Sequence, residues 1–188
     1  RVRLDDPSFH REKAEVFETI KHVSGFVYIQ HPDFEADDVI ALVATDLHPR
    51  DEVVIVSSDS DFIQLISERV NLWDARKKIF TPDWDCGNYI VWKALRGDPT
   101  DNVPGVKGVG QKTADQLCRG TDSALNEFLD AKDGRRKDFE TSYAVIKLKN
   151  VPSSGLQVVQ SDFLVDSLFE EFSKRKFKSI IGKAWSGW

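Results

Sequence analysis

Acidic residues gather at three places in the sequence, each beside a segment that predicts a helix or a strand. The groups are Glu35, Asp37 and Asp38; Asp59 and Asp61; and Asp98 and Asp101. Taken alone, each group has an ordinary structural explanation, because acidic side chains stabilise the first turn of a helix and Asp caps turns. Together these carboxylates would repel one another strongly unless cations lay between them. Mg²⁺ prefers oxygen ligands and keeps several waters, so the groups predict a site for two Mg²⁺ (or Mn²⁺) ions. A calcium-binding EF-hand fits poorly, because the segment that starts at Asp59 lacks the required Gly and the closing Glu.

The elements that position these groups alternate between helix and strand over the first eighty or so residues. Helical spacing of apolar residues predicts helices over 16–23, 38–47 and 61–68. Runs of β-forming residues predict strands over 26–29, 53–56 and 70–73. The strand at 53–56 has no alternation of polar residues, which predicts a strand covered on both faces. This order indicates an α/β fold with a central, mostly parallel sheet flanked by helices. The first two acidic groups follow strands that could be neighbours, where ligands bind in such sheets.

The rest of the sequence changes character and predicts short helices joined by Gly-, Pro- and Asp-rich turns. Helical spacing recurs over 89–95, 113–117, 124–129, 137–147 and 164–177, and residues 152–155 read as a linker. We therefore expect three parts: an α/β core over 1–84, a helical DNA-binding region over 85–150, and C-terminal helices over 151–188 that pack back on the core.

A glycine-containing turn at residues 104–114 predicts contact with a phosphate backbone. Gly108 and Gly110 flank one apolar residue, and a helix follows. Glycines let a backbone approach a phosphate closely, and amides at a helix start can hold it. An ordinary turn is the alternative, but the whole eleven-residue string is more specific than a lone Gly-x-Gly. The expected DNA-binding residues are Lys107, Gly108, Val109, Gly110, Gln111, Lys112 and Thr113.

These motifs occur in an order that resembles the bacterial and bacteriophage 5′→3′ exonucleases related to flap endonucleases. The order is Glu-Ala-Asp-Asp at 35–38, Ser-Asp-x-Asp at 58–61, and Gly-Asp-x-x-Asp-Asn-x-x-Gly-Val-x-Gly-x-Gly at 97–110. The ending, Phe169 to Ile181, is also similar to the close of that family's nuclease domain. The resemblance covers roughly residues 15–182 and implies a 5′ nuclease (PIN-like) core followed by a helix-hairpin-helix subdomain.

The resemblance also implies roles for the acidic groups. Residues 35–38 would belong mainly to a catalytic metal site, Asp59 and Asp61 would lie between two ions, and Asp98 and Asp101 would complete a second, looser site. The hairpin would grip a duplex backbone, with a K⁺ ion held by hairpin carbonyls. The implied reaction is metal-dependent phosphodiester hydrolysis in branched or 5′-ended DNA, or RNA–DNA, during replication or repair.

One part of the family pattern has no match in this chain. The family begins with a strand that carries a further metal-ligand Asp, followed by a basic helical arch, and nothing ahead of Glu35 matches that strand. His10, Arg11 and Lys13 do not make an arch by themselves. The chain also contains no Met, so we expect a fragment with an incomplete active site, which binds branched DNA but cleaves it poorly on its own.

Charge and composition limit the remaining choices. A net charge of -5 is unusual for a DNA-binding protein, but a metal-binding acidic cluster accounts for part of it. No apolar run is long enough for a membrane span, and two cysteines make no disulfide framework. We expect a cytoplasmic monomer in a bacterial or phage-infected cell, with replication proteins as partners. One alternative is a non-catalytic structure-specific DNA-binding fragment whose active site is incomplete or completed by another polypeptide. Another is a metal-dependent phosphatase, which would leave the hairpin unexplained.

Overall fold

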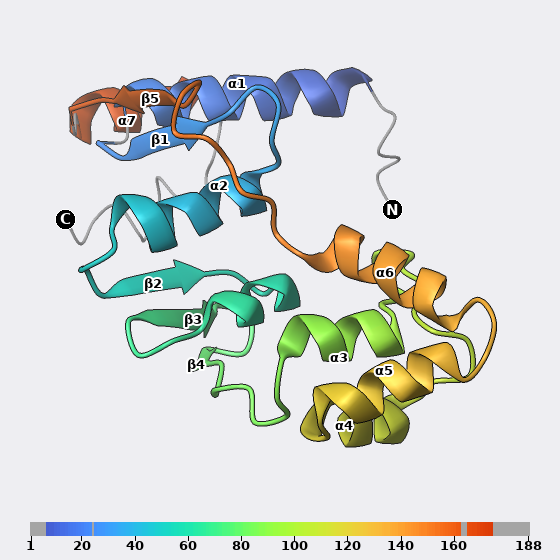
Figure 1. The fold of residues 1–188 in the computed structure, drawn as a ribbon. Helices are drawn as coiled ribbons and strands as arrows, with labels where there is room; N and C mark the ends of the chain where they lie inside the picture. Colours follow the sequence, from blue (N-terminus) through green and yellow to red (C-terminus); the bar gives the residue numbers. More distant parts are fainter. Residues whose placement is uncertain (1–6, 24, 163–164, 175–188) are drawn as a thin grey trace. The chain divides into compact units, whose positions relative to one another are not determined.

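A computed structural model describes residues 7–23, 25–162 and 165–174 (Figure 1). These residues form two compact units, one made of residues 34–151 and the other of the described residues on either side of that range. Within the described ranges, none of the helices combines the length and the apolar character that crossing a membrane requires.

The unit made of the two ends of the chain pairs an early strand with a late one. Its elements are α1 (Pro7–Val23), β1 (Val27–Gln30), β5 (Gln157–Gln160) and α7 (Val165–Lys174). β1 and β5 run antiparallel with Val27 opposite Gln160. The sequence predicted β1 and α7 with slightly different bounds and missed β5. Residues 175–181, which belong to the predicted last helix and to the family-like ending, lie outside the described residues. β1 therefore does not pair with the next strand along the chain.

The unit of residues 34–151 begins with a small sheet and the helices that cover one side of it. Its first elements are α2 (Ala36–Leu42), the π-helical η1 (Val43–Leu47), β2 (Val53–Val56), the 3₁₀-helical η2 (Ser60–Leu65), β3 (Val70–Asp74) and β4 (Ile79–Phe80). β2 and β3 are parallel, with Val53 opposite Val70, and β4 is antiparallel to β3. A connection as short as 75–78 can only return antiparallel. The α/β class is confirmed, and the sheet is mixed rather than mostly parallel.

Side chains on one face of the β2–β3 pair are buried, and those on the other face are exposed. Ile55 and Leu72 pack with Ala44 of η1 and Phe62 of η2 in one apolar cluster. On the opposite face, Val54 is 52% exposed and Val56 is 66% exposed. The expectation that this strand is covered on both faces is therefore wrong within this unit.

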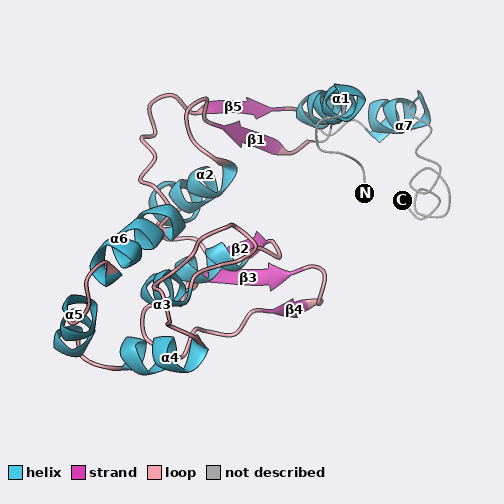
Figure 2. Cartoon of the chain, turned by 90° about the vertical axis from the view of Figure 1, so that its right-hand side faces the viewer, coloured by secondary structure: helices cyan, strands magenta, loops and turns pink. Residues whose placement is uncertain are grey.

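The second half of the unit is helical, as the sequence predicted. Its helices are α3 (Tyr89–Arg96), α4 (Gln111–Arg119), α5 (Asp122–Asp130) and α6 (Arg135–Ile146). α3 packs against both α4 and α6 (Figure 2), and Leu95 and Leu129 are fully buried in their core. Ile63 of η2 packs against this core as well as against the sheet cluster. Residues 34–151 therefore pack as one unit. The expected boundary at residue 84 is not a boundary in packing, and it stays a prediction about which part of the chain does what.

Candidate active site

The first acidic group lies at the start of α2. Glu35 is the N-cap residue, but its side chain makes no capping hydrogen bond, so capping does not explain this carboxylate. Asp38 is buried, and its Oδ1 accepts a hydrogen bond of 2.8 Å from the backbone N–H of Lys149. Its Oδ2 is buried with no hydrogen-bond partner and lies 3.7 Å from Lys149 Nζ, which is also 4.0 Å from Glu35 Oε2. The loop after α6 therefore fixes Asp38 and sets a cation beside the group.

The second and third acidic groups converge on one buried lysine of α3. Lys93 Nζ forms ion pairs with Asp61, with Asp98 at 2.7 Å and with Asp101 at 3.7 Å. The Lys93 side chain is only 4% exposed, so its pairs with Asp61 and Asp98 are poorly solvated, whereas Asp101 is exposed. Because η2 and the turn after α3 both face this lysine, the fold brings together carboxylates that are far apart in the sequence.

Local capping explains part, but not all, of these two groups. Asp59 Oδ1 accepts from the backbone N–H of Asp61 at 2.9 Å, and Asp98 Oδ1 accepts from the N–H of Thr100 at 2.8 Å. Each of these bonds uses one oxygen; the second oxygen of Asp98 is the one that pairs with Lys93 Nζ at 2.7 Å. Asp59 and Asp98 therefore both accept local backbone hydrogen bonds, as the structural explanation predicts. This role does not exclude that the same carboxylates also bind a ligand.

Electrostatic effects connect the three groups. Burial raises the pKa of Asp37, and repulsion from Asp59, Glu35 and Asp38 raises it further, against a backbone hydrogen bond that lowers it. Burial likewise raises the pKa of Asp61, and Asp59 adds to this effect, while Lys93 offsets only part of it. Asp59 therefore raises the pKa of Asp37 in the first group and of Asp61 in its own group, so the carboxylates of different groups repel one another.

Lys93 helps to keep Asp98, in the third acidic group, ionised. Burial alone would raise the pKa of Asp98, but hydrogen bonds from Lys93 and Thr100 outweigh burial and hold the pKa well below its usual range. Burial alone would lower the pKa of Lys93, but Asp61 and Asp98 raise it above its usual range. Both partners are therefore fully charged at neutral pH.

The donor set fits a hard divalent cation in its chemistry, although the present arrangement is not a formed metal site. All the side chains offer carboxylate oxygens, which are the ligands that Mg²⁺ prefers. Within the described ranges, no three Asp, Glu, His or Cys side chains lie close enough together to hold an ion. Lys93 and Lys149 instead occupy positions beside the carboxylates and supply positive charge there.

Sequence reasoning missed Lys93, although the sequence carries a signal for it. Tyr89, Trp92 and Lys93 lie at helical spacing in α3, and all of them are buried. A lysine on the apolar face of a helix is almost never buried without a partner. That position therefore indicates acidic partners, but it does not say which ones.

The predicted DNA-binding hairpin connects α3 to α4. A Cβ placed on Gly108 or Gly110 would meet no atom within 4 Å, so the protein's own packing does not require glycine there. Gly108 has a φ of +83°, which favours glycine, whereas Gly110 is the N-cap residue of α4 with a φ of −97°. Lys107 and Lys112 are exposed beside them, but the side chain of Val109 is buried in the helical core. Any contribution of Val109 to an interface would therefore come from its backbone.

Two other glycines hold the turn that carries Asp98. A Cβ on Gly97 would lie 2.7 Å from the carbonyl carbon of Pro104, and one on Gly105 would lie 2.4 Å from the backbone nitrogen of Gly97. Both glycines have positive φ. This close backbone contact joins the Asp98 turn directly to the start of the hairpin.

The α/β core and the acidic groups lie in the part of the chain that is similar to known nucleases. A family model described as 5′-3′ exonuclease, N-terminal resolvase-like domain, matches residues 3–89. The 5′-3′ exonuclease of Aquifex aeolicus is 34% identical over 205 residues, which cover 96% of this chain and 68% of that protein. The chain belongs to the 5′-3′ exonuclease family.

Other relatives match smaller parts. The thermostable DNA polymerase I of Thermus thermophilus is 39% identical over 128 residues, or 64% of this chain, and the match spans only 15% of the polymerase. A solved T5 5′-exonuclease with divalent zinc ions bound is 27% identical with a TM-score of 0.45, covering 61% of this chain and 46% of that one. A T5 flap endonuclease in complex with DNA and metal ions is 26% identical with a TM-score of 0.44, covering 61% of this chain and 46% of that one.

Proposed function

We propose that this chain is the metal-binding and DNA-docking part of a divalent-metal-dependent 5′ nuclease. The observation that supports the proposal is the electrostatic interaction between three acidic groups that are far apart in the sequence, in a chain of the 5′-3′ exonuclease family. The substrate would be branched or 5′-ended DNA, or RNA–DNA, and the setting DNA replication or repair in the cytoplasm.

The acidic residues would hold the ions and orient the substrate phosphate. Residues Glu35, Asp37 and Asp38 would hold one Mg²⁺ or Mn²⁺, Asp98 and Asp101 a second, with Asp59 and Asp61 between them. Bound ions of this kind supply an activated water and stabilise charge on the phosphate and the leaving oxygen. The backbone N–H of Lys149 keeps Asp38 in one orientation, and the turn held by Gly97 and Gly105 does the same for Asp98.

The hairpin would dock the duplex through its backbone. Open space at Gly108 and Gly110 leaves room for a phosphate at the start of α4, where exposed backbone N–H groups favour an anion. Such contacts read the shape and charge of DNA rather than its sequence. The family resemblance adds a K⁺ ion held by hairpin carbonyls, which remains part of the proposal.

The direct test of this function is cleavage of a labelled 5′-flap duplex by the 188-residue chain, with Mg²⁺ varied and EDTA as the control. Cleavage that depends on Mg²⁺ and leaves a 5′-phosphate supports a nuclease. The absence of a formed three-carboxylate group within the described residues, and the position of Lys93, favour a second candidate, a non-catalytic module that binds branched DNA. Tight binding to the flap duplex without cleavage at any Mg²⁺ concentration would support that candidate.

Lys149→Ala should lower the Mg²⁺ concentration needed for half-maximal cleavage by about twofold to fivefold. The ammonium group lies 3.7 Å from Asp38 Oδ2 and 4.0 Å from Glu35 Oε2, so it competes with a metal for both oxygens. The alanine variant keeps the backbone N–H that orients Asp38. Lys147→Ala, an exposed neighbour, is the matched control, and an equal shift in both variants would contradict a local competition.

Gly110→Thr should weaken duplex binding about fivefold to tenfold at moderate salt while leaving thermal stability unchanged. Thr is as good an N-cap residue as Gly, and the φ of −97° suits it, so α4 is preserved. The added side chain would occupy the space proposed for the phosphate. Fluorescence anisotropy with a duplex measures the effect, and Gly134→Asn at the N-cap of α6 is the control. Unchanged DNA affinity with Gly110→Thr would remove the hairpin from the proposed interface.

A further inference from the structure

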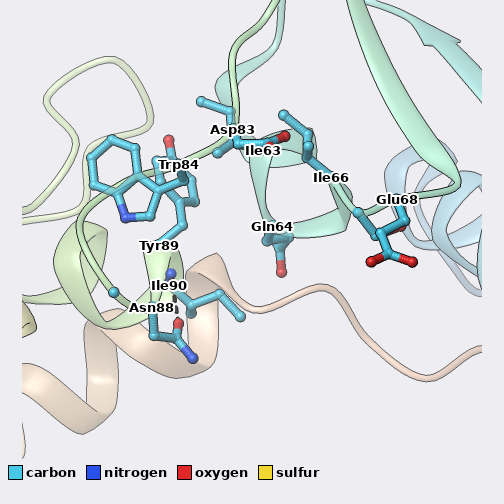
Figure 3. A pocket seen from close by; sticks show the side chains of 11 residues that line it. Ile63, Gln64, Ile66, Glu68, Asp83, Trp84, Asn88, Tyr89 and Ile90 are labelled. Carbon is cyan, nitrogen blue, oxygen red and sulfur yellow. Dashed lines mark hydrogen bonds between the residues drawn. The ribbon is translucent and has the colours of Figure 1, made fainter.

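A pocket of about 350 Å³ lies between η2 and the first turn of α3, within the unit of residues 34–151 (Figure 3). Its apolar lining comes from Ile63, Ile66, Trp84 and Ile90, all of them half-buried. The pocket is at the start of α3, whereas the Asp98 turn follows the end of that helix, which is about 12 Å long. The pocket therefore lies apart from the Asp98 turn, and Asp61 and Lys93, which belong to the same two elements, are not part of its lining.

The aromatic side of the pocket is fixed by its own contacts. The Trp84 ring packs edge-on against Tyr89 at 5.0 Å and against Trp92 at 4.8 Å between ring centroids. Its indole N–H donates a hydrogen bond of 3.0 Å to the carbonyl oxygen of Cys86. Figure 3 shows Trp84 and Tyr89 on one side of the pocket, with Ile66 and Glu68 across from them. An aromatic side chain that is already fixed loses little conformational entropy when a ligand covers it, which favours binding.

Two carboxylates give the pocket its charge. Glu68 and Asp83 both line it and are exposed, and neither forms an ion pair with another described residue. The lining contains no Lys, Arg or His. A phosphate group would be repelled here, whereas an ammonium or guanidinium group would be attracted. This charge distinguishes the pocket from the hairpin, which carries exposed lysines.

We propose that this pocket docks a protein partner through a short peptide segment in which an aromatic or aliphatic side chain stands next to a Lys or Arg. The apolar side chain covers Trp84 and Ile66, and the cation lies between Glu68 and Asp83. Apolar anchors in a fixed pocket with a charged rim are typical of protein interfaces. This inference goes beyond the proposed nuclease function and does not depend on it, because no residue of the acidic centre lines the pocket.

The test is an NMR titration of the full ¹⁵N-labelled chain with the probe acetyl-Phe-Arg-amide. The Trp84 indole N–H, assigned with a Trp84→Phe variant, reports occupation of the pocket. We expect its resonance and the backbone resonances of the lining residues to shift together and to saturate. The neutral isostere acetyl-Phe-citrulline-amide should bind about tenfold more weakly, because it lacks the cation.

Charge variants make the test specific. In the double variant Glu68→Gln, Asp83→Asn, the arginine probe should bind about tenfold more weakly, and the citrulline probe should bind as it does to the unmodified chain. Both residues are exposed, so folding should be unaffected, and flap cleavage and DNA binding should not change. The control is Glu52→Gln, Asp133→Asn, which removes the same charge from exposed positions outside the pocket.

Three results would overturn the proposal. The first is an absence of shifts at the lining residues with acetyl-Phe-Arg-amide. The second is equal binding of the arginine and citrulline probes, which would show that Glu68 and Asp83 do not select a cation. The third is a shift of the same resonances by a deoxythymidine oligonucleotide in place of the peptide, which would assign the pocket to nucleic acid.

Discussion

Asp37→Asn should reduce metal-dependent cleavage of a 5′-flap duplex about a hundredfold or more, while duplex binding stays the same. Asp37 forms no ion pair with a described residue, and its carboxylate is crowded by Asp59, Glu35 and Asp38. If these side chains hold a catalytic ion, loss of one ligand misplaces the reacting groups, and small misplacements cost about a hundredfold in rate. The hairpin lies elsewhere, so docking of the duplex should survive.

The same variant should be slightly more stable than the unmodified chain in the absence of metal. The pKa of Asp37 is raised in the folded state, so ionisation of this group disfavours folding. The penalty is absent below the usual carboxyl pKa and grows as the pH rises through the raised value. Asn removes it, and we expect the melting temperature at neutral pH to rise by about 1–3 °C, with no difference in acid.

These two measurements distinguish a catalytic role from a structural one. A variant that loses cleavage because it is misfolded would lose stability and DNA binding as well. Asp133→Asn, at an exposed position, should change neither cleavage nor stability. Unaltered cleavage by Asp37→Asn would show that the group at residues 35–38 is not part of the active site.

Lys93→Met should lower the free energy of unfolding by about 2–4 kcal/mol in metal-free buffer. Removing one partner of a buried ion pair typically costs about 3–5 kcal/mol, and partial exposure of Asp61 and Asp98 reduces that figure. Met keeps much of the length of the side chain but leaves three carboxylates without their cation. Urea unfolding followed by tryptophan fluorescence measures the change.

Mg²⁺ should restore part of the stability that Lys93→Met loses. If the uncovered carboxylates bind the ion, Mg²⁺ at about 10–100 times its dissociation constant returns about 1.4–2.7 kcal/mol by mass action. The unmodified chain should gain less, because Lys93 already occupies the position. NaCl at equal ionic strength is the control for screening, and Lys112→Met is the control for loss of an exposed lysine. Equal effects of Mg²⁺ and NaCl on Lys93→Met would show that these carboxylates do not form a metal site.

The local elements and the acidic groups could be predicted because their signals lie within a few residues. The apolar spacing of Val39, Ile40, Val43 and Leu47 predicted a helix, and the segment at 53–56 predicted a strand, both close to their observed bounds. The turn that carries Asp98 and the hairpin glycines form one continuous string. Such patterns reflect helix periodicity, β propensity and backbone conformation, which depend on neighbours in the sequence.

The pairing of strands and the burial of their faces could not be predicted in the same way. The sequence allowed β1 and the next strand to be neighbours, yet β1 pairs with β5, which lies at the other end of the chain. Val56 was expected to be covered, yet it is exposed within its unit. Both outcomes depend on which distant segment packs against a strand, and a four-residue apolar run is compatible with several such partners.

The sequence by itself determined which residues could carry the chemistry, because residue type and local spacing identify carboxylates at element ends and glycines before a helix. Only the tertiary structure decided how those residues are held. Lys93 and Asp61 are 32 residues apart, and Lys149 and Asp38 are 111 residues apart. A charge in a poorly solvated interior needs a partner, but its identity depends on which elements the packed core brings into contact. The lysines that neutralise and orient the acidic centre therefore became visible only once the chain was folded.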